Sequence, residues 1–194
     1  IPLGLMAGLH RDDHTGRGLM AGSVLGFSLP NFWQGMMLIL LFSVWLGWLP
    51  FVGLATPKHY ILPAIALALY PIAYISKLVR SNLSEVMRQD YIRMAKAKGL
   101  SKSKVILRHA LKNAMLPVVT YTGPLIAFLM TGSFVIESIF SIPGIGMEFV
   151  KSITNRDYAA IMGLTIYMGS LIVVCNIICD FVCALIDPRV KLGS

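Results

Sequence analysis

Long apolar runs alternate with shorter polar segments along this chain of 194 residues. A helix needs about 20 predominantly apolar residues to cross the hydrocarbon core of a bilayer. The runs at 19–50, 60–80, 117–140 and 159–186 reach that length, whereas residues 1–9 do not. The pattern therefore predicts an all-α fold, a polytopic transmembrane helical bundle with about four complete spans and the end of another.

Composition agrees with a membrane protein. Hydrophobic residues make up 56% of the chain and charged residues 13%, whereas soluble domains have about 45–50% and about 25%. A net charge of +8 would also suit a nucleic-acid-binding domain. Most of the basic residues, however, lie in one segment between two apolar runs, so we expect no nucleic-acid partner and expect the lipid bilayer as surroundings.

The positions of the basic residues predict the topology. Fourteen of the seventeen Lys and Arg residues fall in polar segments that the spans would place on one side, and three, Lys58, Lys151 and Arg156, fall on the other. Loops rich in Lys and Arg stay in the cytoplasm. We therefore expect residues 81–116 and the C-terminus to be cytoplasmic and residues 141–158 to be external.

The first residues, Ile1–Leu9, are apolar but too short to span a bilayer. They also lack the basic start of a signal peptide. We interpret them as the end of a helix that begins upstream, and therefore expect an N-terminally truncated chain.

The basic segment has its own helical pattern. Apolar residues recur at three- and four-residue steps over Arg80–Lys98, which predicts one amphipathic helix. Gly99 is expected to end it, because glycine readily adopts the left-handed conformation of a helix terminus. Ser101 would begin a second helix at Lys102–Met115, and Pro117 would open the next span. We call residues 81–116 the basic elbow.

Three interpretations of the basic elbow compete. Two helices of this kind can lie on anionic lipid headgroups. A nucleic-acid surface would need a series of stacking aromatic residues, and Tyr91 is the one obvious candidate in the segment. The third interpretation is a docking surface for a cytoplasmic partner that acts on the transmembrane helices.

Other polar residues carry weaker patterns. The group His10, Asp12, Asp13 and His14 could suggest a metal, but one short loop is poor support and we assign no metal site. The sequence has no G-x-x-x-x-G-K-[ST] loop for nucleotide phosphates. Three cysteines four residues apart are expected to be small buried side chains at a helix contact, namely Cys175, Cys179 and Cys183.

A few polar residues fall inside or at the ends of apolar runs, where they are costly unless they face the bundle or a wet cavity. Asn31 and Gln34 follow Pro30, and Glu137 lies in the 117–140 run. We predict these three as residues of a translocation path or gate, with pairing inside the bundle as the alternative for Glu137.

The basic elbow also carries a family resemblance. Its sequence DYIRMAKAKGLSKSKVILRHALKNAMLPVV resembles the EAA-type cytoplasmic loop of bacterial ABC-importer permeases, in the oligopeptide, dipeptide and nickel branch. The pieces SLPNFWQGMMLILLFSVWLGWLP, GPLIAFLMTGSFVIESIFSIPGIGMEFVKSITNRDY and ALIDPRVK resemble other parts of that branch in the same order. Within it, an oligopeptide permease B-type subunit is the most similar. Where the general motif has Glu-Ala-Ala, this chain has Arg93, Met94 and Ala95.

The resemblance implies a type-1 ABC transmembrane fold in the bacterial inner membrane and no enzymatic activity. It implies a second, homologous permease subunit, two cytoplasmic ATPases that use ATP and Mg, and an external or periplasmic substrate-binding protein. This chain itself would carry no cofactor and no catalytic residue. The alternative function is a secondary transporter or channel that works without ATP.

The resemblance also implies site residues. Four external residues would contact the binding protein, namely Asn155, Arg156, Asp157 and Tyr158. The residues expected to couple to the ATPase are Arg93, Met94, Ala95, Lys96, Ala97, Gly99, Leu100, Leu116 and Pro117.

Overall fold

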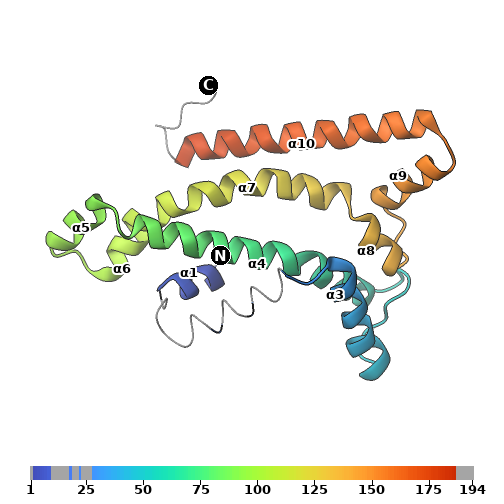
Figure 1. The fold of residues 1–194 in the computed structure, drawn as a ribbon, viewed down its shortest axis with the longest axis horizontal. Helices are drawn as coiled ribbons and strands as arrows, with labels where there is room; N and C mark the ends of the chain where they lie inside the picture. Colours follow the sequence, from blue (N-terminus) through green and yellow to red (C-terminus); the bar gives the residue numbers. More distant parts are fainter. Residues whose placement is uncertain (1, 10–17, 19–21, 23–27, 187–194) are drawn as a thin grey trace. The chain divides into compact units, whose positions relative to one another are not determined.

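The computed structural model describes residues 2–9, 18, 22 and 28–186, and within that part of the chain it consists of helices and their connections, without a strand (Figure 1). The chain divides into two compact units. The first comprises Ile1–Leu25, Ile72–Gly123 and Asn176–Ser194. The second comprises Gly26–Pro71 and Pro124–Cys175.

The helices have the following bounds. They are α1 (Pro2–Leu9), α3 (Asn31–Leu38), the π-helix η1 (Ile39–Trp45), the 3-10 helix η2 (Pro57–Tyr60), α4 (Ile61–Val86), α5 (Asp90–Ala97), α6 (Lys102–Lys104), the π-helix η3 (Val105–Ala110), α7 (Leu111–Thr131), α8 (Phe134–Ile139), α9 (Ile145–Thr154) and α10 (Tyr158–Ile186).

Three helical stretches in the described part of the chain are long and apolar enough to cross a membrane. They are Pro57–Val86, Val105–Ile139 and Tyr158–Ile186. A shorter apolar helix, Asn31–Trp45, lies in the run from which a further span is predicted. Much of residues 19–27 lies outside the described residues, as does the polar group at 10–14, so that span stays a prediction.

In the first unit, the core of the basic elbow forms where α5 turns back on the end of α4 (Figure 1). A single helix over Arg80–Lys98 was predicted, and this is wrong: α4 ends at Val86 and α5 begins at Asp90. At about 100° per residue, Leu83 and Ile92 would point to opposite sides of one straight helix. The break between the two helices lets both side chains enter the same core.

The helix boundary predicted at Pro117 is also wrong. Helical residues run without a gap from Lys102 to Thr131, and Pro117 lies inside α7. Proline removes one backbone hydrogen bond, here to the carbonyl of Asn113, and membrane helices tolerate that loss. The helix ends instead before Gly132, which has φ +81°.

In the second unit, α8 packs against the start of α4 and against α3. Leu62 and Ala66 of α4 are buried with Ile136 and Phe140 of α8. Gly35 of α3 is buried, and a Cβ at this position would lie 3.5 Å from the Phe140 ring. This packing fixes α8, and with it the glutamate that α8 carries.

Candidate functional site

The basic elbow is built on a small apolar core. Ile92 and Ala95 of α5 point inward, while residues between them in the sequence point outward. Burial of apolar surface contributes about 25 cal/mol per Å², so this core holds α5 in place. The buried members of the cluster are Leu83, Ile92, Ala95, Val105, Ala110 and Ala114, and partly buried Leu5, Val86, Met87, Tyr91 and Leu100 pack against them.

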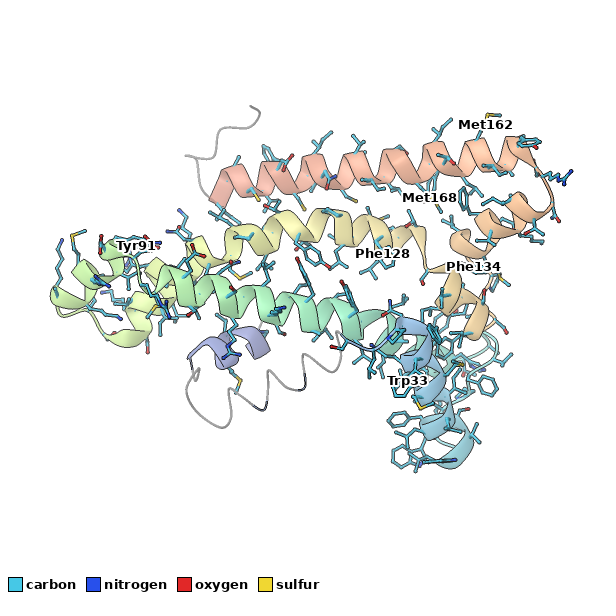
Figure 2. The ribbon with its side chains drawn as sticks, viewed as in Figure 1. Trp33, Tyr91, Phe128, Phe134, Met162 and Met168 are labelled. Carbon is cyan, nitrogen blue, oxygen red and sulfur yellow. The ribbon has the colours of Figure 1, made fainter. Side chains whose placement is uncertain are left out.

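One polar link adds to the apolar core. The side-chain amide of Asn113 on α7 donates a hydrogen bond of 2.8 Å to the hydroxyl oxygen of Tyr91 on α5. Figure 2 labels Tyr91 where α5 meets the rest of the basic elbow. The bond joins the two helices at a defined point on the surface of the basic elbow.

Gly99 ends α5 in the predicted conformation. Its φ is +76°, and the Leu100 N–H donates to the Ala95 carbonyl at 3.4 Å while the Gly99 N–H donates to the Lys96 carbonyl at 3.0 Å. These two bonds form the Schellman motif, in which glycine is the usual residue at this position. No atom lies within 4 Å of a Cβ built on Gly99, so the backbone angle and not the space requires glycine.

The outer face of α5 is exposed and largely basic. The exposed coupling candidates are Arg93, Met94, Lys96 and Ala97. Met94 is 61% exposed, and the ion pair between Arg93 and Asp90, at 3.6 Å, lies on the surface. A pair of this kind contributes little to stability. This face therefore has no structural task within the described chain and is available to a partner.

The remaining coupling candidates lie elsewhere in the first unit. Ala95 is buried in the core and Leu100 is half-buried against it. Leu116 is half-buried and Pro117 exposed, and both lie within α7. The predicted set therefore divides into an exposed face, a buried support and two positions on the adjoining helix.

Glu137 occupies the second candidate site, in the other unit. It lies on α8 and is only 7% exposed. Its Oε2 accepts a hydrogen bond of 2.6 Å from the backbone N–H of Met147, in the first turn of α9. The positive end of a helix dipole favours a carboxylate at this position.

A cavity of about 310 Å³ adjoins this glutamate, and apolar side chains form most of its wall. Asn31 and Gln34, the other predicted path residues, do not line it. Asn31 is half-buried at the start of α3, and the buried Gln34 amide donates to the Leu29 carbonyl at 2.8 Å. The structure thus does not bring the three predicted path residues to one cavity.

Asn155, Arg156 and Asp157 connect α9 to α10, Tyr158 begins α10, and all four of these external candidates are exposed. Arg156 has φ +58°. The Asp157 N–H donates to the Ser152 carbonyl at 2.9 Å, and its carboxylate accepts from the Ala160 N–H at 3.0 Å. Asp157 therefore caps α10, which leaves Asn155, Arg156 and Tyr158 with exposed side chains.

The cysteines on α10 are buried, and these described residues form no disulfide. The Cys183 sulfur lies 3.5 Å from the Thr120 hydroxyl of α7, which supports their interpretation as small side chains at a helix contact. In the described residues, no group of three His, Cys, Asp or Glu side chains is placed to hold a metal.

Sequence reasoning missed the glycines that surround Glu137. The Pro143–Gly146 stretch leads into α9, which starts at Ile145. Its relation to Glu137 depends on contacts between separate elements, which no local pattern encodes. The one available sign was a costly carboxylate in an apolar run close to several glycines.

Comparison with known proteins adds a family and close relatives. A family model described as "binding-protein-dependent transport system inner membrane component" matches residues 1–192. The dipeptide transport system permease protein of Bacillus subtilis (strain 168) is 47% identical over 190 residues, which cover 98% of this chain and 62% of the relative. The oligopeptide transport system permease protein of Haemophilus influenzae (strain ATCC 51907 / DSM 11121 / KW20 / Rd) is 42% identical over 193 residues, covering 98% and 63%.

A further relative is the oligopeptide transport system permease protein AppB of Bacillus subtilis (strain 168). It is 40% identical over 201 residues, which cover 98% of this chain and 64% of the relative. The chain thus spans less than two thirds of the length of each of these three proteins.

Proposed function

Because the chain belongs to the family of binding-protein-dependent transport system inner membrane components, we propose that it is part of a permease subunit of an ATP-driven importer of peptides. The family and the apolar helices place it in the inner membrane as a multi-pass protein. The chain would contribute part of one half of the translocation path, and a second, homologous permease subunit would contribute the other half.

The peptide substrate is proposed from the relatives. The names of the similar proteins specify dipeptide and oligopeptide transport systems, and the similarity extends over nearly the whole of this chain. The proposal is therefore peptides as a class. The alternative of a secondary transporter working without ATP is not favoured by membership of this family.

The observation that carries the proposed coupling is the exposed face of α5 above its buried core. The core keeps the helix in a fixed position, and Met94 projects outward with basic residues around it. We expect this face to dock on one of two cytoplasmic ATPases, which bind and hydrolyse ATP with Mg. A stiff support at Ala95 and Gly99 would transmit their closure to α4 and α7.

The rest of the proposed assembly follows from the family description. An external or periplasmic binding protein would deliver peptides, and the exposed side chains of Asn155, Arg156 and Tyr158 support a contact with it. Residues 81–116 and the C-terminus would face the cytoplasm, in agreement with the placement of the basic residues.

The experiment uses Met94→Asp in the whole protein, co-expressed with its partner subunits. Met94 is exposed, so its replacement leaves the core of the basic elbow intact. We expect the ATPase to be lost on co-purification and ATP-driven peptide uptake into proteoliposomes to fall at least about 10-fold, the equivalent of about 1.4 kcal/mol, since a carboxylate buried in an interface is costly.

Ile153→Asp is the matched control. Ile153 is also an exposed apolar residue on a short helix, with 51% exposure, but it lies in α9. We expect the ATPase to stay bound to this variant. Retained ATPase binding and uptake by Met94→Asp would overturn the proposed coupling, and uptake by the wild-type protein without any ATPase would overturn the importer itself.

A further inference from the structure

The strongest unexplained feature of the described chain is the burial of the Glu137 carboxylate. Burying an ionised carboxylate is costly unless hydrogen bonds or charges compensate. No ion pair to Glu137 is found among the described residues, and its side chain is 7% exposed. A buried carboxylate at this position therefore needs compensating partners.

Compensation comes from the start of α9. The Met147 N–H donates to Oε2 at 2.6 Å, and it is one of the N–H groups at a helix start that have no partner within the helix. Hydrogen bonds to a charged acceptor are about twice as strong as neutral ones. The glutamate thus caps α9 from a neighbouring helix, because Gly144, the residue at the cap position, makes no side-chain cap bond.

A second link runs through the backbone of the same residue. The Glu137 carbonyl accepts a hydrogen bond of 2.8 Å from the Ile142 N–H. Ser141 adopts φ +53° there, so the chain reverses at the end of α8. One residue therefore binds the connection between α8 and α9 with its carbonyl and the start of α9 with its carboxylate.

Glycines admit the carboxylate on two sides. A Cβ at Gly132 or at Gly144 would collide with the Glu137 carboxylate, and a Cβ at Gly146 would lie 2.7 Å from the backbone nitrogen of Phe134. Phe134 is labelled at the start of α8 in Figure 2. Gly144 has φ −123°, which any residue adopts. At Gly144, then, the space taken by the carboxylate is what requires glycine.

We propose that Glu137 is a positioning residue of the transport cycle: its carboxylate locks α9 to α8 so that both helices move as one body. This inference rests on the proposed function as an importer. It makes α8 and α9 together a rigid element in the external part of the path. The close fit against glycines leaves the carboxylate directed at the protein backbone, which distinguishes this role from direct binding of a substrate.

The test is a double-mutant cycle in the whole protein with its partners, using Gly144→Ala, Glu137→Ala and the double variant. If Gly144 is glycine in order to make room for the Glu137 carboxylate, the methyl group of Gly144→Ala should destabilise the protein only while that carboxylate is present. We expect Gly144→Ala alone to lower the unfolding midpoint of the purified complex by about 2–4 °C. In the Glu137→Ala background the same change should lower it by less than half as much.

Glu137→Gln tests the charge in transport. It keeps the size of the side chain and one acceptor oxygen but loses the negative charge that the start of α9 favours. We expect the maximal rate of ATP-driven uptake to fall about 10-fold, the equivalent of about 1.4 kcal/mol, while the concentration of loaded binding protein for half-maximal uptake stays unchanged. The control is Glu148→Gln, since the Glu148 carboxylate is exposed and pairs with Lys151 at the surface, and it should behave as the wild type.

The outcomes separate the two proposals. Equal effects of Gly144→Ala with and without the Glu137 carboxylate, or wild-type uptake by Glu137→Gln, would overturn the positioning role. A shift in the half-maximal concentration alone would also overturn it, because that result marks a substrate contact. Absence of ATP-driven uptake by the wild-type complex would overturn the proposed importer function. The unfolding midpoints of the double-mutant cycle would then still test whether the Glu137 carboxylate holds α9 to α8.

Discussion

The side-chain amide of Asn113 on α7 and the phenolic oxygen of Tyr91 on α5 lie 2.8 Å apart, joined by a hydrogen bond between residues 22 positions apart in the chain. Both residues lie in the first unit, and their helices contribute to the core of the basic elbow. This bond is the polar contact by which a push on α5 would reach α7 directly, and its removal tests whether the basic elbow acts as a stiff element.

Tyr91→Phe removes the hydrogen bond and keeps the ring. A bond of this kind contributes about 0.5–1.5 kcal/mol, so we expect peptide uptake per ATP hydrolysed to fall several-fold while the ATPase stays bound. The measurement is parallel uptake and phosphate release in proteoliposomes.

Tyr60→Phe serves as the control for the loss of a hydroxyl group. Tyr60 is 52% exposed at the end of η2, and we expect its replacement to leave uptake per ATP unchanged. Equal ratios for Tyr91→Phe and the wild type would show that the bond does not contribute to coupling.

The backbone angle of Gly99 gives a second prediction. An L-residue in the left-handed region costs about 1–2 kcal/mol, so Gly99→Ala should loosen the end of α5. We expect faster amide hydrogen exchange over α5 and Leu100, as followed by mass spectrometry, with little change in α9.

Gly163→Ala is the matched control, in which the same substitution should stabilise a helix. Gly163 lies inside α10, is exposed, and has no atom within 4 Å of an added Cβ. Alanine is more favourable than glycine in a helix interior by about 0.5–1 kcal/mol, so exchange in α10 should slow. Slower exchange over α5 in Gly99→Ala would contradict the argument from φ.

The basic elbow shows what the sequence can and cannot predict. The stop at Gly99 was predicted correctly, because a glycine that follows an amphipathic run is a local feature. The break before Asp90 was not predicted, because Met87, Arg88 and Gln89 carry no turn preference of their own. That break exists because Leu83 and Ile92 share one core, which is a requirement of the tertiary structure.

The same limit applies around α8. Ser141 and Arg156 adopt φ +53° and +58°, although neither residue has the conformational freedom of glycine. Their conformations are imposed by backbone bonds that reach back along the chain, such as the bond from the Ile142 N–H to the Glu137 carbonyl. The all-helical class and the family follow from the sequence, whereas the position of the Glu137 carboxylate at the start of α9 depends on contacts between separate helices.

Substitutions at Ile92 and Met94 should distinguish the stability of α5 from its binding to the ATPase. Ile92 has no exposed surface, and truncation of a buried Ile to Ala costs about 2–5 kcal/mol. We expect Ile92→Ala to unfold α5 locally and to speed trypsin cleavage after Lys96 and Lys98. Met94→Ala should leave the cleavage rate unchanged, because Met94 lies outside the core, and should weaken only the binding of the ATPase. Similar cleavage rates for Ile92→Ala and the wild type would show that the apolar core does not hold α5.

Ser141 offers a stabilising change. Its φ of +53° is one that glycine adopts at no steric cost, so Ser141→Gly should raise the unfolding midpoint of the purified complex by about 2–4 °C, the shift that corresponds to about 1 kcal/mol. Ser138→Gly is the control, since Ser138 lies within α8, and glycine there should lower the midpoint instead.

Ser141→Gly also tests transport. If α8 and α9 must move as one body during transport, Ser141→Gly keeps full uptake, because it relieves backbone strain and leaves the Glu137 carboxylate bound to the start of α9. A lower midpoint for Ser141→Gly would mean that the serine hydroxyl stabilises the turn more than its backbone angle strains it.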